Sequence, residues 1–250
     1  MIRDSRFEIR DLRVQSRISN LESRIYWLVQ DLADVPESDE WLSDSERSFL
    51  AGLRFPKRRR DWRLGRWTIK QAICKYLPNG NPSLSSLEIR AASDGAPEAF
   101  QNGAAANISI SISHSNGRSL CAAGLHGFSI GCDLELLEER AESLVRDYFA
   151  PEEIFFCNQT IKREKAIAIN LIWSAKESAL KVLREGLRRD TRSVQIKPDF
   201  PGRENAWNSW TGQCAETSRI FHGWWRTSDG FVLTLASDHP TPIPASARLD

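Results

Sequence analysis

The stretch from Asn107 to Glu135, NISISISHSNGRSLCAAGLHGFSIGCDLE, carries the clearest structural pattern in this chain. Isoleucine alternates with serine over residues 108–113, and a period of two is typical of a β-strand that buries one face. Ser115-Asn116-Gly117 has the composition of a turn, so a second strand is expected over about 119–125. His126-Gly127 interrupts the chain again, and a third strand is expected over about 128–135.

Helical spacing predicts one long helix on each side of these strands. The first is expected over about 57–77 and ends at Pro78-Asn79-Gly80. The second is expected over about 164–184, with Gly186 as its C-terminal cap. Shorter signals complete the pattern: a strand at 25–29, a capping box at Ser43 and Glu46, a helix start at 150–153, and strands at 194–196, 207–210, 220–225 and 231–235.

Helices and strands are therefore mixed without a strict β-α alternation. That order favours an α+β fold with antiparallel sheet over a doubly wound parallel fold. A break near His126-Gly127 divides the chain into two halves of similar length, residues 1–126 and 127–250. We expect each half to hold an antiparallel sheet packed against its long helix.

The composition is that of an ordinary globular protein, with 250 residues, 41% hydrophobic and 27% charged. It excludes a mainly disordered chain, which needs low hydrophobicity and high net charge. The 34 basic and 33 acidic residues give a net charge of +1, which argues against a general nucleic-acid binder. Five cysteines lack metal-ligand spacing, and neither a secretory signal nor an apolar span is visible. We expect a cytoplasmic protein without membrane contact.

Positive charge is concentrated between Arg54 and Arg66, where seven basic residues accompany a single acid, Asp61. Such a cluster raises the local concentration of anions. The alternative is a solvated helix face, which the scarcity of compensating acids disfavours. The pattern therefore indicates a site for phosphate groups of some kind.

Carboxylates recur in two places that could serve a cation. Asp133 and Glu135 stand two residues apart on one expected strand and so point to the same face. Carboxylate oxygens are the ligands that Mg²⁺ prefers, and Glu177, one helical turn before Lys181, is a candidate third carboxylate. Taken singly, these residues also fit the solvent face of a strand and a surface ion pair. His114 likewise fits either a turn residue or a phosphate contact.

The order of these features is more informative than any one of them. With the basic cluster, they are Asp94-Gly95-Ala96-Pro97, Ile112-Ser113-His114-Ser115, Gly131-Cys132-Asp133-Leu134-Glu135 and Trp173-Ser174-x-Lys176-Glu177-Ser178-x-x-Lys181. The chain thereby resembles the 4′-phosphopantetheinyl transferases of the surfactin-synthetase type, whose signatures are G-x-P, I-S-H-S, G-[IV]-D-[IVL]-E and [FW]-[SCT]-x-K-E-[AS]-x-x-K. Phe149-Ala150-Pro151-Glu152-Glu153 matches a further family segment. Ala96 stands where many relatives have a basic or polar side chain, so only a backbone role carries over to Gly95 and Pro97.

The resemblance implies a fold and an activity. Family members have two halves related by a pseudo-twofold axis, with the active site between them, and such a chain is expected to work as a monomer. They bind coenzyme A as substrate and Mg²⁺ as cofactor, with Mn²⁺ as an alternative. They transfer the 4′-phosphopantetheine arm to a serine of an acyl or peptidyl carrier protein and release 3′,5′-adenosine bisphosphate.

The resemblance also implies roles for particular residues. Asp133, Glu135 and Glu177 correspond to metal ligands, and Glu177 and Lys181 to the catalytic base and charge partner. The residues implied in coenzyme A binding are Arg60, Arg66, Gly95, Pro97, Ser113, His114 and Lys176, with Arg59 or Arg63 as substitutes for the two arginines.

Two other readings of the same features remain open. A non-catalytic module that binds coenzyme A or a nucleotide would use the basic groove and leave the carboxylates dispensable. A nucleic-acid binder is opposed by the near-neutral charge and by the three acids. Four tryptophans late in the chain fit either a carrier-docking surface or, as we favour, the packing of a C-terminal sheet: Trp207, Trp210, Trp224 and Trp225.

Overall fold

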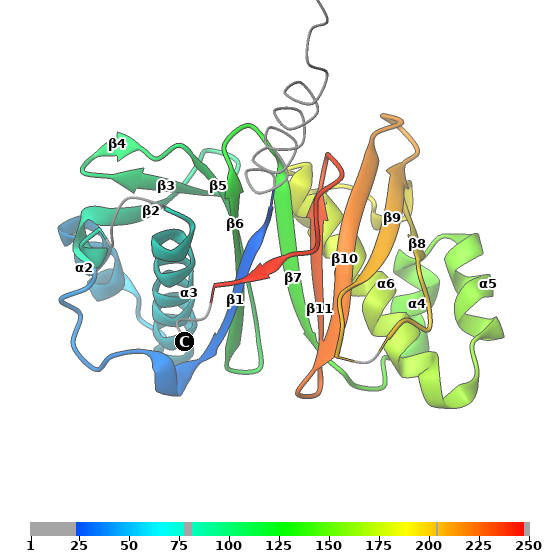
Figure 1. Ribbon diagram of the computed structural model, residues 1–250. Coiled ribbons are helices and arrows are strands. Elements are labelled where there is room, and N and C mark those ends of the chain that lie inside the picture. The colour runs from blue at the N-terminus through cyan, green and yellow to red at the C-terminus, as the bar shows by residue number, and fades with distance from the viewer. Residues whose placement is uncertain (1–23, 78–81, 204, 248–250) are drawn as a thin grey trace, which may run out of the picture.

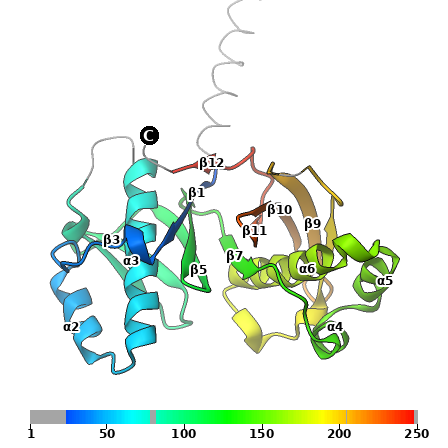
Figure 2. The same ribbon diagram turned by 90° about the horizontal axis from the view of Figure 1, so that it is seen from below.

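The computed structural model describes residues 24–77, 82–203 and 205–247. It has four layers: helices, a sheet, a second sheet and further helices (Figure 1). One half of the chain forms the first two layers and the other half forms the last two, as the view from below also shows (Figure 2). The expected α+β fold with two repeated sheet-and-helix halves is confirmed. None of the helices described is both long and apolar enough to cross a membrane.

Two helices and two small sheets make up the described residues of the first half. Helix α3 packs on strands β1, β5 and β6, and Ile108 and Ile110 face it in one apolar core. The strand order is β12-β1-β6-β5 in one sheet and β2-β3-β4 in the other. The bounds are β1 Tyr26–Asp31, α2 Asp44–Gly52, α3 Pro56–Tyr76, β2 Leu87–Ala91, β3 Pro97–Gln101, β4 Ala104–Ala105, β5 Ile108–Ser115 and β6 Arg118–Leu125, with short 3-10 turns at Leu32–Asp34 and Leu84–Ser86.

The second half contains one five-stranded sheet in the order β7-β11-β10-β9-β8, antiparallel throughout. Helix α6 packs on β7 and β11. Trp210 and Trp225 are buried in the core between this sheet and α6, so packing explains them better than docking. The bounds are β7 Ile130–Leu136, α4 Glu142–Tyr148, α5 Pro151–Gln159, α6 Lys162–Val182, β8 Val194–Pro198, β9 Asn208–Cys214, β10 Ile220–Ser228, β11 Phe231–Ser237 and β12 Ala245–Ser246, with 3-10 turns at Gly186–Arg188 and Thr191–Ser193.

The two sheets share a core with each other as well as with their own helices. Leu120 and Ala122 of β6 pack against Cys132 and Leu134 of β7, together with Leu233 of β11. The chain also crosses back, because β12 pairs in parallel with β1 of the first half. Burial between the sheets therefore holds the halves together.

A buried lysine-glutamate pair occurs once in each half, in the same setting. Lys70 on α3 binds Glu46 at 2.5 Å, and Glu46 accepts the backbone N–H of Ile89. Lys176 on α6 binds Glu153 at 2.8 Å, and Glu153 accepts the backbone N–H of Ile196. Each lysine also donates to two backbone carbonyls. The second half thus repeats the plan of the first down to one ion pair.

Most of the expected elements are found within a few residues of their predicted bounds, and the capping box at Ser43 and Glu46 is present. The predicted cap of α6 at Gly186 is wrong, because the helix ends at Val182 and the left-handed residue that follows it is Arg184, with φ +59°. The pattern did not predict β2, β3, β4, β12 or α4. Pro78-Asn79-Gly80, the expected end of α3, lies outside the described residues.

Candidate active site

The predicted residues of the I-S-H-S and G-x-D-x-E motifs meet where β5 of one half lies beside β7 of the other. Ser113 Oγ donates to Asp133 Oδ1 at 2.8 Å across this boundary. Lys181 Nζ, from α6, donates to the same oxygen at 2.9 Å and to the carbonyl of Cys132 at 2.8 Å. Asp133 is therefore the point at which three elements converge.

Gly131 explains how α6 comes so close to β7. A β carbon at this position would lie 2.0 Å from the carbonyl oxygen of Ser178, which no side chain can tolerate. The absence of a side chain lets the helix backbone rest directly on the strand. The glycine of the motif therefore sets the distance between the strand carboxylates and the helix that bears Glu177 and Lys181.

Glu135 is held by two donors. Trp173 Nε1 donates to its Oε1 at 2.9 Å, and Arg140 Nη2 to its Oε2 at 2.5 Å. Arg140 is itself anchored by Asn170 at 2.7 Å. Burial and the charge of Asp133 raise the pKa of Glu135, while Arg140 lowers it. The carboxylate is thus oriented by a residue that the sequence analysis did not single out.

Glu177 completes the acidic cluster on the helix side. Burial, and then the negative charge of Asp133, raise its pKa to about 7, although Lys181 acts in the opposite sense. Burial lowers the pKa of Lys181, but the charges around it, Asp133 first, more than offset this, so the ammonium is favoured. The mutual repulsion among the acids shows that the three carboxylates share one neighbourhood.

The chemistry of this neighbourhood suits a hard divalent cation. Its donors are carboxylate oxygens, and Asp133 Oδ2 is a buried oxygen with no hydrogen-bond partner among the described residues. Such an orphaned anionic oxygen costs free energy unless a cation or donor satisfies it. As the side chains lie, Glu135 is turned to Arg140 and Trp173, and no three acidic, histidine or cysteine groups in the described part of the chain stand close enough together to enclose a metal ion.

A cavity of about 570 Å³ lies beside α3 and is lined by residues of the first half. We call it the Arg66 cavity, and His114 stands at its edge. Arg66 lies over the ring of Trp62 at 4.7 Å and forms no ion pair with any described residue. Burial lowers the pKa of its guanidinium, which still stays protonated. Its lining includes the charged residues Lys57, Arg58, Asp61, Arg66 and Arg90, together with Gly95, Pro97 and His114.

A second cavity of about 590 Å³, the Arg60 cavity, opens on the other side of His114. It is lined by Lys57 and Arg60 from α3 and by Glu135 and Arg140 from the second half. Because His114 is exposed and lines both cavities, the two form one basic surface that leads to the carboxylates.

The arginines of the basic cluster fall into two groups, those that contact other parts of the protein and those that line a cavity. Arg59 donates to the carbonyl of Leu50 at the end of α2, and Arg63 binds Asp39 at 2.8 Å. Both are occupied with the fold and cannot substitute for the others. Arg66 faces one cavity and Arg60 the other. Arg58, which we did not predict, lines the Arg66 cavity. It stands about one and a half helical turns before Arg63 on α3, so the two side chains leave the helix on different sides.

Lys176 does not lie in the site. Its side chain is fully buried, and its ammonium is saturated by Glu153 at 2.8 Å and by the carbonyls of Thr191 and Val194. Burial lowers its pKa and Glu153 opposes this. The expectation that Lys176 contacts pyrophosphate is therefore corrected, because Lys176 has no exposed surface with which to reach a ligand.

The remaining predicted residues are brought together. Gly95 and Pro97 line the Arg66 cavity, but Ser113 is nearly buried and gives its hydroxyl to Asp133. The sequence analysis missed Arg58, Arg90 and Arg140. Arg58 belongs to the basic cluster and could have been included, whereas Arg90 lines the Arg66 cavity only through long-range folding, and Arg140 stands five residues after Glu135 outside every motif.

Comparisons with known proteins give the family of this chain. A model of the 4′-phosphopantetheinyl transferase superfamily matches residues 27–124 and 129–236. A search of curated proteins finds no match. A holo-(acyl-carrier-protein) synthase from Bacillus anthracis str. Ames, in complex with CoA (3′,5′-ADP), is 22% identical over 41% of this chain and 95% of its own, with a TM-score of 0.36. A holo-(acyl-carrier-protein) synthase from Thermotoga maritima is 23% identical over 51% and 74%, with a TM-score of 0.33. Because the family model spans most of both halves, this chain belongs to the 4′-phosphopantetheinyl transferase superfamily.

Proposed function

We propose that this enzyme is of the surfactin-synthetase-activating type and transfers the 4′-phosphopantetheine group of coenzyme A to a serine of an acyl or peptidyl carrier protein. The observation that carries the proposal is the junction, at His114, of the Arg66 cavity with the Arg60 cavity, which is lined by Glu135 of the acidic cluster. One end of that junction suits a phosphorylated nucleoside, and the other suits phosphoryl transfer.

The basic surface supports one placement of the phosphate groups of coenzyme A. Arg66 and Arg58 are free of ion pairs with the described residues and face one cavity, where they would hold the ribose phosphate. His114, between the cavities, and Arg60 on the far side would meet the pyrophosphate. Guanidinium groups hold phosphate oxygens through paired hydrogen bonds, so the nucleotide would be fixed while the pantetheine end extends past His114.

Asp133, Glu135 and Glu177 are the residues that would hold Mg²⁺, and Mn²⁺ has the same preference for oxygen ligands. The orphaned Asp133 Oδ2 and the all-carboxylate donor set support this assignment. When bound, the ion offsets negative charge on the pyrophosphate oxygens.

The transfer itself is a displacement at phosphorus. The carrier serine oxygen forms a bond to the phosphorus that bears pantetheine, and the bond from that phosphorus to the adenosine bisphosphate oxygen breaks. Glu177, whose pKa of about 7 suits a base near neutral pH, takes the serine proton. Lys181 Nζ, already directed at Asp133, offsets the charge that develops as 3′,5′-adenosine bisphosphate leaves.

Two lesser expectations belong with this proposal. Both halves of one chain contribute to the site, so we propose that the enzyme works as a monomer. All five cysteines are free thiols, which suits a reducing compartment such as the cytoplasm.

The decisive experiment is intact-mass spectrometry of a purified apo acyl or peptidyl carrier protein incubated with the enzyme, coenzyme A and Mg²⁺, beside an EDTA control. We expect a metal-dependent gain of one phosphopantetheine. No gain on several carriers, together with coenzyme A binding by calorimetry, would replace the proposal by a non-catalytic binding module.

A further inference from the structure

The end of α6 places an arginine where a glycine is usual. The helix ends at Val182, and Arg184 turns the chain with φ +59°. The N–H of Glu185 bonds the carbonyl of Leu180 at 3.2 Å and that of Arg184 bonds Lys181 at 3.0 Å, which is the pattern of a helix cap that favours glycine. A side chain with a β carbon is disfavoured in this conformation, and the arginine side chain makes contacts that a glycine could not make.

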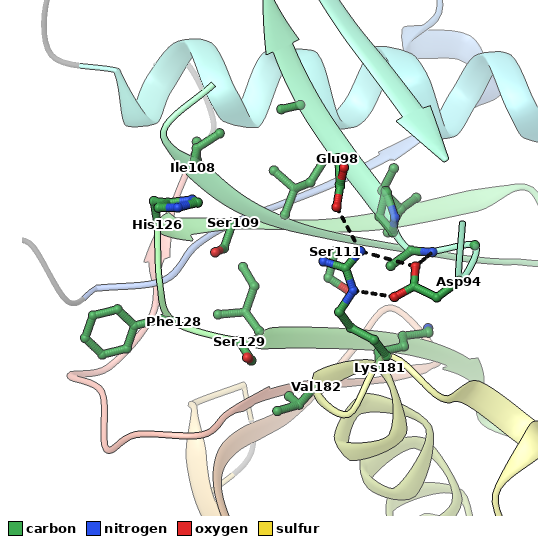
Figure 3. A pocket seen from close by; sticks show the side chains of 18 of the residues that line it. Asp94, Glu98, Ile108, Ser109, Ser111, His126, Phe128, Ser129, Lys181 and Val182 are labelled. Atoms are coloured by element: carbon green, nitrogen blue, oxygen red, sulfur yellow. Dashed lines mark hydrogen bonds and ion pairs between the residues drawn. The ribbon is translucent and has the colours of Figure 1, made fainter. Parts of the chain in front are cut away.

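The side chain of Arg184 reaches from the second half to the first. Its Nε lies 2.6 Å from Asp94 Oδ2 and its Nη2 lies 2.8 Å from Glu98 Oε1. A further bond of 3.2 Å to Asp94 Oδ1 makes the contact with Asp94 bidentate. Figure 3 shows Asp94 and Glu98 on one side of the cavity, opposite Lys181 and Val182, with the dashed contacts crossing between. Arg188 adds a bond to the carbonyl of Asp94 at 3.1 Å.

Asp94 and Glu98, which form ion pairs with Arg184, lie on either side of the Gly95-Ala96-Pro97 turn. Asp94 Oδ1 also accepts the N–H of Ala96 at 3.0 Å, and Gly95 has φ +88°. Gly95 and Pro97 line the Arg66 cavity, and they also line a larger cavity of about 750 Å³ between the two halves. The turn is therefore the wall that separates the two spaces.

The ion-pair bridge formed by Arg184 with Asp94 and Glu98 begins three residues after Lys181. α6 carries Glu177 and Lys181, and its last turn delivers Arg184 to the wall of the Arg66 cavity. The pKa of Asp94 is lowered to about 2 by Arg184 and then by the N–H of Ala96, so the bridge is ionised at neutral pH. No other ion pair described in the structure joins α6 or its cap to this turn.

We propose that Arg184 is a positioning residue that fastens the Asp94–Pro97 turn to the end of α6, and so fixes the nucleotide-binding wall relative to Glu177 and Lys181. The inference rests on the proposed function, since it assigns the Arg66 cavity to coenzyme A. Ion pairs as exposed as these contribute little to global stability. The role of Arg184 is therefore to hold one part of the site in register with another.

Arg184→Gly separates this role from a structural one. Glycine accepts the left-handed conformation, so the thermal midpoint should stay equal to that of the wild type or rise. Calorimetric Kd and KM for coenzyme A should both increase by about tenfold, within the range that misplacement of binding groups produces. The KM for the carrier protein should stay within about twofold of the wild-type value.

Three further variants complete the experiment. Asp94→Asn keeps the acceptor for Ala96 but weakens the bridge, and it should reproduce the effect of Arg184→Gly on coenzyme A. Arg184→Lys should restore part of the affinity. Arg192→Ala removes another exposed arginine, whose ion pair in the described structure is with Asp190, and should behave as the wild type.

The outcomes distinguish this inference from the proposed function. Wild-type affinity and KM for coenzyme A in Arg184→Gly, with an active wild-type enzyme, would overturn the positioning role alone. A wild-type protein that transfers nothing would overturn the proposed function, while a weakened Kd for coenzyme A in Arg184→Gly would still support the bridge.

Discussion

Asp133 illustrates how single residues in this site are held by both halves of the chain. Its Oδ1 accepts hydrogen bonds from Ser113 in the first half and from Lys181 in the second, while its Oδ2 has no partner in the described structure. One oxygen is thus fixed by the protein and the other is left for a ligand. A change at any of the three residues alters the other two.

Replacing Glu177 by glutamine should separate stability from activity. Its pKa of about 7 lies above the ordinary 4.5, so ionisation destabilises the metal-free fold, with no cost below about pH 4 and the full cost above about pH 7. After discounting for partial solvation, we expect Glu177→Gln to stabilise the protein by about 1–2 kcal/mol at pH 8 in EDTA. Urea unfolding at pH 8 and pH 5 measures this difference.

The same variant should lose at least about a hundredfold in transfer rate, because it removes the candidate base and a metal ligand. Asp133→Asn, which keeps a side chain of the same size, is the matched variant and should also be inactive. Near-normal transfer by both would contradict the assignment of the carboxylates.

Asp94 should give the protein a measurable acid sensitivity. Its folded pKa of about 2 lies below the ordinary 3.8 because of Arg184 and the N–H of Ala96. The stability that it contributes is therefore present in full above about pH 4 and is lost as the pH falls toward 2. The stability difference between the wild type and Asp94→Asn, from urea unfolding, should be constant from pH 7 to 5 and shrink below pH 4. A difference independent of pH down to 2.5 would refute this.

At the scale of elements, α3 and α6 are equivalent helices of which only one carries the acids. Both are 21 residues long, and each buries a lysine, Lys70 or Lys176, at the same place along the helix. Glu177 follows Lys176 on α6, whereas Gln71 follows Lys70 on α3. The repeated lysine therefore belongs to the fold, whereas the glutamate, present in one half only, is the residue that we propose for the reaction.

Lys176→Met and Lys70→Met should destabilise the protein by similar amounts, about 3–5 kcal/mol each, because each leaves a buried glutamate without its charge partner. Adding Glu153→Gln to Lys176→Met should recover part of the loss, as coupled neighbours are not additive. Urea unfolding of the single and double variants provides the measurement. If Lys176→Met unfolds like the wild type but transfers nothing, Lys176 acts on the substrate after all.

Local patterns predicted the elements wherever one face of a strand or helix is buried throughout. The alternation of Ile108, Ile110 and Ile112 with serine fixed β5, because each isoleucine packs toward α3 and the serines face the second half. β12 has only two residues and its partner lies more than 200 residues away in the chain, so no local period marks it. The cap of α6 was misassigned because glycine propensity at Gly186 outweighed a side-chain contact that only the fold creates.

The same limit applies to the site. Asp133 and Lys181, which belong to two of the sequence motifs, are in contact at 2.9 Å, since β7 and α6 pack on each other. Arg184 contacts Asp94 and Glu98, which are close to it only after the halves have docked, whereas Arg140 meets Glu135 and Asn170 through the folding of its own half. The misassignment of Lys176 has a local cause. A helix turns about 100° per residue, so Lys176 points away from the face that Glu177 and Lys181 share.

At the scale of the whole molecule, the halves depend on each other for a core. β6 and β7 bury Leu120, Ala122, Cys132 and Leu134 against one another, and β12 returns to the sheet of the first half. We propose residues 1–126 and 127–250 as the two structural units, although neither can cover its inner sheet face alone.

Separate expression of these two fragments should therefore give insoluble or aggregated protein, and co-expression should give a soluble complex. Size-exclusion chromatography and the carrier assay would detect it. A fragment that is monomeric and cooperatively folded on its own would show that the shared core is dispensable.

The paired lysines have a consequence for how this protein tolerates change. In a library of all single substitutions scored by cellular abundance, positions 70 and 176 should give nearly the same profile. Each lysine forms an equivalent set of buried contacts, one glutamate and two backbone carbonyls. Scored by transfer, the neighbours Gln71 and Glu177 should diverge completely, one permissive and the other invariant. Positions 70 and 71 of the first half would thus serve as an internal control for positions 176 and 177. Substitutions in the first pair would measure the requirements of folding alone, and those in the second pair would measure the requirements of folding and of transfer.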